Sequence, residues 1–133
     1  IFGWMLKKWK AIPIDRTNIQ TAKESIKRGE KAFSDGYKVI ILPEGTRTVT
    51  GKIKNLKKGG FHMAINTKAP ILPIGCQGAF EFKPKDRWYI KPGRVSLNVG
   101  TIIEPSEYEQ LGIDGLVKNV RNQFKDLTGY ELE

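Results

Sequence analysis

The stretch Val39-Ile40-Ile41-Leu42-Pro43-Glu44-Gly45-Thr46-Arg47 joins an apolar run to a polar turn. The run, from Tyr37 to Leu42, is rich in β-branched residues and lacks polar alternation, which predicts a strand buried on both faces of a mostly parallel sheet. The turn places Glu44 and Arg47 together at the carboxyl end of that strand. Because arginine binds phosphate through a planar fork of donors, and a nearby carboxylate can orient it or accept from a substrate hydroxyl, the turn indicates a phosphate-handling site.

The surrounding patterns predict an α/β fold, with a mostly parallel central sheet flanked by helices. An apolar stripe predicts a helix from about Asn18 to Ser34, with Thr17 or Asn18 as its cap and Asp35-Gly36 as its stop. A short edge strand at 11–14, this helix and the strand at 37–42 together form a βαβ unit. The other predicted elements are helices at 60–67 and about 114–127, a buried strand at 71–76, and paired strands at 88–91 and 94–99.

Length and charge narrow the class of protein. The chain has 133 residues, the size of one ordinary domain, so we expect a single domain over residues 1–133. The net charge is +9, and because the two signs balance over residues 61–133, the excess lies entirely before them. Such an excess attracts anionic membranes, nucleic acid or phosphorylated small molecules, or is simply a solvated lysine-rich surface. No apolar run reaches the roughly 18–20 residues of a membrane-spanning helix, and no signal-peptide pattern is present.

The first ten residues form an amphipathic pattern. Apolar residues recur at helical spacing, beside a cluster of lysines; they are Ile1, Phe2, Met5, Leu6 and Trp9, with Lys7, Lys8 and Lys10. A short helix with this pattern suits a membrane interface, although such a short stripe more often packs against a core.

Several other motifs fail on spacing or composition. Five residues separate Gly45 from Gly51 where a P-loop needs four, and Ile53 stands where its Ser or Thr would be. His62 is the only histidine and Cys76 the only cysteine, too few for a metal site of the usual histidine and cysteine ligands. A nucleophilic triad is not expected either, because it would have to use His62. Cys76 lies in an apolar run and is predicted to be a small buried side chain in a reduced setting. No nucleic-acid-reading module appears, so nucleic acid is not expected as a partner.

Four segments in this order resemble the glycerolipid acyltransferase family, in particular the 1-acyl-glycerol-3-phosphate (lysophosphatidate) acyltransferases. They are Ile14-Asp15-Arg16, Leu42-Pro43-Glu44-Gly45-Thr46-Arg47, Leu56-Lys57-Lys58-Gly59-Gly60-Phe61 and Ala69-Pro70-Ile71-Leu72-Pro73-Ile74. The ordered set is far more specific than any single member. The resemblance covers roughly residues 1–105, and the closing helix carries no signature.

The resemblance implies roles for particular residues. The family's phosphate and glycerol contacts fall on Arg16, Glu44 and Arg47, Gly45 and Thr46 shape the turn, and Lys57 or Lys58 extends the positive pocket. A phosphomonoester carries nearly two negative charges, which such a set can bind through charge-assisted hydrogen bonds. The segment 69–74 corresponds to a family block associated with acyl-donor binding or with support of the site, and a buried strand explains it equally well.

The sequence departs from the family at the catalytic element. The family uses His-x4-Asp, in which the histidine is the general base and the aspartate orients it. The fifth residue after His62 is Thr67, and His62 follows the Glu44–Arg47 turn, whereas the family's pair precedes the Ile-Asp-Arg segment. We therefore expect no catalytic residue in this chain, an acyltransferase domain incomplete at its N-terminus, and the His-x4-Asp pair upstream of Ile1.

The resulting expectation is acyl transfer from acyl-CoA or acyl-carrier protein to the sn-2 hydroxyl of lysophosphatidic acid, at the cytoplasmic, anionic face of a membrane. No metal or organic cofactor is implied beyond the donor's own carrier. Two alternatives stay open. One is an acyltransferase acting on glycerol-3-phosphate, another lysophospholipid or an ornithine-type lipid, and the other is a non-catalytic module that binds anionic lipid. Without the N-terminal segment, apolar surface at 39–42 and 71–74 should be exposed, with marginal stability as the consequence.

Overall fold

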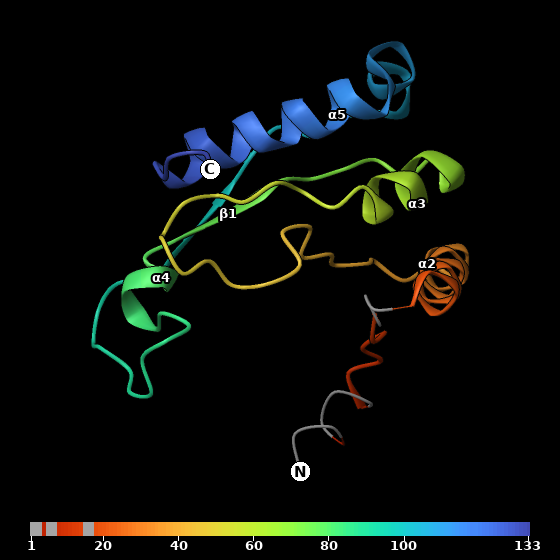
Figure 1. The fold of residues 1–133 in the computed structure, drawn as a ribbon. Helices are drawn as coiled ribbons and strands as arrows, with labels where there is room; N and C mark the ends of the chain where they lie inside the picture. The colour runs from red at the N-terminus through yellow and green to blue at the C-terminus, as the bar shows by residue number, and fades with distance from the viewer. Residues whose placement is uncertain (1–3, 5–7, 15–17) are drawn as a thin grey trace. The chain divides into compact units, whose positions relative to one another are not determined.

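The computed structural model describes Trp4, residues 8–14 and residues 18–133, which form two compact units, Ile1–Ile40 and Ile41–Glu133 (Figure 1). The first unit contains helix α2 (Ile19–Ser34). The second contains, in order, α3 (Gly59–Thr67), β1 (Ile74–Gln77), α4 (Ala79–Phe82), β2 (Ser96–Val99) and α5 (Pro105–Thr128). Most of the amphipathic N-terminal pattern and the Asp15-Arg16 pair lie outside the described residues. No helix in the described part of the chain has the length and hydrophobicity to cross a membrane.

Helix α2 begins and ends where the sequence predicts. The Oδ1 atom of Asn18 accepts hydrogen bonds from the amides of Gln20 at 2.8 Å and Thr21 at 3.4 Å, which satisfies donors that a helix start leaves free. Residues 11–14 form no ladder with other described residues, so the predicted edge strand is wrong. Instead, the Pro13 carbonyl accepts a hydrogen bond of 2.8 Å from the Ser25 hydroxyl of α2.

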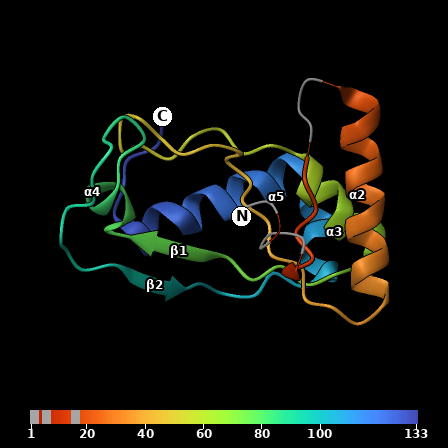
Figure 2. The ribbon, with the colours of Figure 1, turned by 90° about the horizontal axis from the view of Figure 1, so that it is seen from below.

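The second unit is built on a two-stranded antiparallel sheet covered by α5. Strand β1 pairs with β2 in the register Ile74↔Val99. Figure 2 shows α5 running across β1. The approach is close at Gly75, where an added Cβ would lie 2.6 Å from the Cβ of Leu127 in α5. The missing side chain of Gly75 therefore lets the helix contact the strand.

The core of this unit lies between α3 and α5. Its buried cluster consists of Leu56, Phe61, Ile103, Tyr108, Leu116 and Val120. The Tyr108 hydroxyl lies 3.2 Å from the Ala64 carbonyl oxygen and 3.3 Å from that of Ala69, so it donates to the carboxyl-terminal end of α3. Burial and the neighbouring acidic side chains Glu109 and Glu104 raise the pKa of Tyr108. The hydroxyl thus stays a donor throughout the neutral range.

The predicted buried strand at Tyr37–Leu42 is not formed. Ile40 is 91% exposed and Leu42 is also exposed, whereas Ile41 packs against Gly60, where an added Cβ would meet its Cδ1 atom at 3.0 Å. A strand buried on both faces needs neighbouring strands to pair with and helices that cover both faces of their sheet. In the described part of the chain, the only parallel pairing is a single bridge between Ile53 and Leu132, so the mostly parallel sheet is not confirmed.

Two further predictions from local pattern are wrong. Residues 88–91 form no strand, and β2 pairs with β1 rather than with them. Cys76 is exposed, because side chains alternate along β1 and its neighbour Gly75 takes the buried face toward α5. Helix α5 spans Pro105–Thr128 with a break at Gly112, whose φ is 65°. The part after the break matches the helix predicted at about 114–127, and the part before it was not predicted. The buried strand predicted at 71–76 is also wrong in part, because β1 covers only Ile74–Gln77 and all of its residues except Gly75 are exposed. By contrast, the apolar surface expected at 39–42 and 71–74 is exposed at Ile40, Leu42, Leu72 and Ile74.

Candidate functional site

The Glu44–Arg47 turn is held against the far side of its own loop. Gly45 has a φ of 77°, a conformation that favours glycine, and its amide donates to the Leu42 carbonyl at 3.1 Å. The Glu44 Oε2 atom accepts a hydrogen bond of 3.0 Å from the amide of Lys54. The amide of Lys57 donates to the Pro43 carbonyl at 2.8 Å. Residues 43–47 and 54–57, separate in the sequence, therefore form one clamped turn.

The rest of the loop is anchored at both of its sides. The Thr48 Oγ1 atom accepts from the amide of Gly51 at 3.1 Å, and Gly51 lies against the Phe80 ring of α4, where an added Cβ would meet a ring carbon at 3.1 Å. Ile53 is buried, its amide donates to the Glu131 carbonyl at 2.8 Å, and its carbonyl accepts from the amide of Glu133 at 2.9 Å. The C-terminal tail thus fixes the segment that precedes Lys54 and Lys57.

The basic side chains of the site differ in their contacts. Arg47 and Lys57 are exposed, and the side chains of both are without a hydrogen bond or ion pair to any described residue. Lys58 is also exposed, and its Nζ lies 2.6 Å from the Oδ1 atom of Asp114 in α5. Two cations beside the turn are therefore free to meet an anion, and the third is paired.

The structure brings some of the predicted site residues together, and their proposed role in binding stays a prediction. The backbone bonds bring Lys57 beside the residues of the turn, and Glu44 holds that turn through Lys54. Thr46 is exposed, like Arg47. The sixth predicted residue near the turn, Lys58, faces Asp114. Arg16 lies outside the described residues, so its predicted role stays a prediction.

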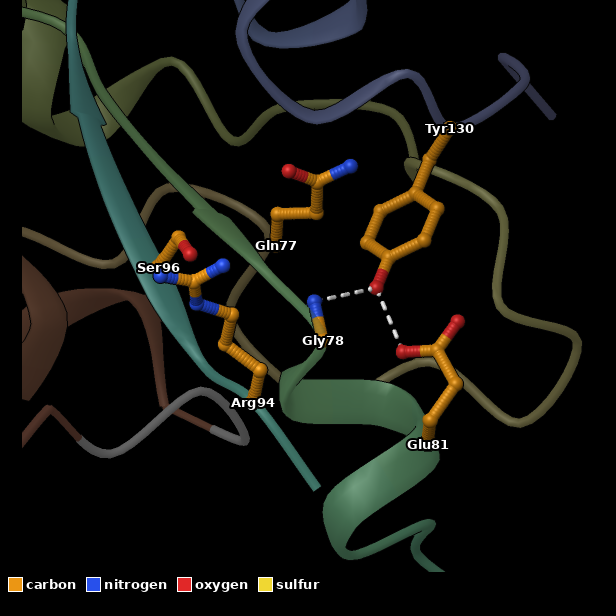
Figure 3. A pocket seen from close by; sticks show the side chains of 6 residues that line it. All are labelled: Gln77, Gly78, Glu81, Arg94, Ser96 and Tyr130. Carbon is orange, nitrogen blue, oxygen red and sulfur yellow. Dashed lines mark hydrogen bonds between the residues drawn. The ribbon is translucent and has the colours of Figure 1, made fainter.

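A polar hollow lies at another place in the second unit. Its volume is about 390 Å³, and it is lined by Gln77, Gly78, Glu81, Arg94, Ser96 and Tyr130 (Figure 3). The Tyr130 hydroxyl accepts from the amide of Gly78 at 2.8 Å and donates to Glu81 Oε2 at 2.6 Å. Burial, followed by the hydrogen bond to Glu81, raises the pKa of Tyr130. None of the residues predicted from the sequence lines this hollow, and nothing in their spacing links positions 49 residues apart.

Comparison with known proteins identifies the class. The family model described as Acyltransferase matches residues 1–77, more than half of the chain, and the chain belongs to this family. A 1-acyl-sn-glycerol-3-phosphate acyltransferase of Pseudomonas aeruginosa is 37% identical over 100 residues, which is 74% of this chain and 38% of that protein. A protein with the same description from Cocos nucifera is 32% identical over 114 residues, covering 85% of this chain and 37% of the relative.

A solved structure resembles the fold. The crystal structure of the 1-acyl-sn-glycerophosphate (LPA) acyltransferase PlsC from Thermotoga maritima superposes with a TM-score of 0.72 at 28% identity. The match covers 80% of this chain and 44% of that structure. The chain therefore has an acyltransferase fold, and it spans less than half the length of the relatives that it matches.

Proposed function

We propose that the protein carrying this chain transfers a fatty acyl group from acyl-CoA or acyl-carrier protein to the sn-2 hydroxyl of 1-acyl-glycerol-3-phosphate, giving phosphatidic acid. The observation that carries the proposal is the clamped turn, which presents Arg47 and Lys57 without partners among the described residues. The descriptions of the relatives support the same activity.

The proposed role of this chain is to bind the acceptor. The phosphate of lysophosphatidic acid carries nearly two negative charges, and the Arg47 guanidinium binds two of its oxygens while Lys57 adds a point charge. Arg16 is proposed to complete the set, as the family resemblance implies. Holding the phosphate end fixes the place of the sn-2 hydroxyl, and such positioning contributes several kcal/mol to the lowering of the reaction barrier.

The general base is proposed to come from a part of the protein outside these 133 residues. His62 does not fit the role, because it is exposed on α3 and Thr67 stands where the family's aspartate would be. The histidine of a His-x4-Asp pair takes the proton of the acceptor hydroxyl. The hydroxyl oxygen then attacks the thioester carbonyl, and the thiolate of the carrier leaves with formation of the new ester bond.

The same missing part is proposed to complete the central sheet. The exposed side chains of Ile40, Leu42, Leu72 and Ile74 support this proposal, because apolar strands of a parallel sheet are normally covered on both faces. In the complete domain, residues 37–42 are proposed to form the strand that the pattern predicts, with the turn at its carboxyl end and the site at the cytoplasmic face of a membrane.

Arg47→Ala in the full-length protein tests the acceptor site. Loss of a bidentate, charge-assisted contact is expected to raise the KM for lysophosphatidic acid about a hundredfold, and Arg47→Lys should recover only part of the loss. Lys52→Ala is the matched control, since Lys52 is an exposed cation of the same loop that the proposal leaves without a role. Unchanged acceptor kinetics in Arg47→Ala overturn the proposal.

A panel of acceptors separates the alternatives. Glycerol-3-phosphate and other lysophospholipids share the phosphate, so their turnover must be compared directly, whereas an ornithine-type lipid lacks the group that Arg47 would bind. A non-catalytic lipid-binding module is the remaining alternative, favoured by the absence of a His-x4-Asp pair from this sequence. Turnover of any acceptor by the full-length protein rules it out.

A further inference from the structure

The loop between α4 and β2 presents large apolar side chains to solvent. Trp88 is 90% exposed and Ile90 is 58% exposed, and Tyr89 lies between them. The Trp88 and Tyr89 rings meet edge to face, with centroids 5.7 Å apart. The loop extends from α4 as an open connection before it enters β2 (Figure 1). Exposed aromatic and aliphatic residues gathered at one place indicate an interaction surface.

The base of this loop is held by a network around Arg87. Its Nη2 atom donates to the carbonyl oxygens of Glu81 at 2.6 Å and Phe82 at 2.9 Å, and its Nε donates to that of Tyr89 at 3.2 Å. The amide of Lys91 donates to the Phe82 carbonyl at 2.9 Å. The guanidinium also lies 4.9 Å from the centre of the Tyr89 ring. The hydrogen bonds thus close the loop on both sides of Trp88 and hold it in the exposed position.

The charge of the loop is strongly positive. Residues 83–94 carry five basic side chains and one acidic one, Asp86, although the two signs balance over residues 61–133 as a whole. Lys85, Lys91 and Arg94 are exposed, and their side chains form no hydrogen bond or ion pair within the described part of the chain. Apolar side chains between unpaired cations match an anionic bilayer, whose interface takes up tryptophan and tyrosine and whose headgroups attract lysine and arginine.

We propose that residues 83–94 form a docking loop for an anionic membrane surface. Trp88 and Ile90 enter the boundary between headgroups and acyl chains, and Lys85, Lys91 and Arg94 lie among the anionic headgroups. Arg87 holds the loop through its hydrogen bonds to backbone carbonyls and does not need to contact lipid. Membrane contact by this loop does not require acyl transfer.

Vesicle binding by the full-length protein tests the loop. The vesicles are phosphatidylcholine with about one third phosphatidylglycerol, compared with pure phosphatidylcholine. The variants are Trp88→Ala, Trp88→Phe and the double variant Lys85→Gln/Lys91→Gln. The matched control is Lys118→Gln/Lys125→Gln, which removes the same charge from exposed positions of α5. Thermal unfolding should be unchanged in all of them, because none of these side chains is part of the core.

Trp88→Ala should weaken binding at least about tenfold, with Trp88→Phe between it and the wild type. The double variant should weaken it about 25-fold, roughly fivefold per cation, and the loss should shrink at high salt. The α5 control should change binding less than about threefold. Equal losses in the two double variants, or wild-type binding by Trp88→Ala, overturn the proposal.

Tryptophan fluorescence shows whether Trp88 itself enters the membrane, even if another part of the full-length protein also binds lipid. Brominated lipid should quench the wild-type emission more than that of Trp88→Phe, because the difference reports Trp88 itself. Equal fractional quenching of the two proteins means that Trp88 stays in water and overturns the proposal.

Binding of a single-stranded oligonucleotide tests nucleic acid as the alternative ligand of the loop. Tight binding that Trp88→Ala removes, while vesicle binding persists, assigns the loop to nucleic acid and overturns the membrane assignment.

Discussion

Glu44 gives the sharpest test of how the turn is built. Its Oε2 atom lies 3.0 Å from the amide nitrogen of Lys54, a partly buried residue, and this bond ties the turn to the far side of the loop. Glu44→Ala removes the acceptor and leaves that amide unsatisfied. Glu44→Gln keeps a carbonyl oxygen at the same reach and loses only the charge. The two variants therefore separate the presence of an acceptor from its ionisation.

The expected magnitudes follow from the type of bond. A hydrogen bond to a charged group contributes about 1.5–3 kcal/mol to the free energy of unfolding, and a neutral one about 0.5–1.5 kcal/mol. Because Glu44 is partly exposed, we expect the lower end, about 1.5 kcal/mol, for Glu44→Ala and about half of that for Glu44→Gln. Urea unfolding followed by circular dichroism measures both, with an unchanged dependence on urea as the sign that the unfolded states are comparable.

The control for this experiment is Glu109→Ala, which removes an exposed carboxylate of α5 outside the loop. The reasoning is refuted if Glu44→Ala unfolds at the same urea concentration as the wild type, or if the control is destabilised equally. Activity of the full-length variants adds a second distinction. If Glu44→Gln keeps stability and loses turnover, the carboxylate contacts the substrate; if it keeps both, Glu44 acts only through the turn.

Three other predictions concern the second unit. Leu116→Ala should cost about 2–5 kcal/mol in urea unfolding, because this fully buried leucine would leave a cavity. Gly78→Ala should be destabilising by more than about 1 kcal/mol, since φ is 84° and the added Cβ would lie 2.1 Å from the Arg94 carbonyl oxygen; equal melting temperatures would contradict this. Tyr130→Phe should lose about 1 kcal/mol at neutral pH. The pKa of Tyr130 is raised in the folded state. The protonated hydroxyl therefore contributes its full stabilisation below the pKa of the unfolded state, about 10, and this stabilisation is lost as the pH rises through the folded-state pKa. The difference in stability between the wild type and Tyr130→Phe should therefore shrink in alkali.

The parts of the fold that the sequence predicts well are those with local signals. Helix α2 is set by the Asn18 cap and by Asp35-Gly36, all within a turn of its ends. Helix α3 also begins within one residue of its predicted start, at Gly59, although no side chain caps it. Strand pairing depends on residues far along the chain. The apolar run at Tyr37–Leu42 has the composition of a buried strand, and it forms none because the described residues supply no neighbouring strand.

The candidate site also contains residues that the sequence indicates and residues that only the structure reveals. The family resemblance implies that Lys57 or Lys58 extends the pocket at the Glu44–Arg47 turn, and the Lys57–Pro43 hydrogen bond brings Lys57 beside that turn. The partner of Lys58 could not be predicted, because Asp114 belongs to a helix that carries no motif. The support that the C-terminal tail gives to Ile53 was missed for the same reason. Residues that bind a substrate leave a pattern in the sequence, whereas residues that hold them in place are defined only by folding.

The ion pair between Lys58 and Asp114 is compatible with a role for Lys58 in binding. Both side chains are exposed, so the pair contributes only about 0–1 kcal/mol despite its separation of 2.6 Å. A charge-assisted bond to a phosphate dianion is stronger, about 1.5–3 kcal/mol. A phosphorylated acceptor held by Arg47 and Lys57 would therefore draw Lys58 away from α5. Binding at the turn would then release Asp114 of α5 from its ion pair with Lys58.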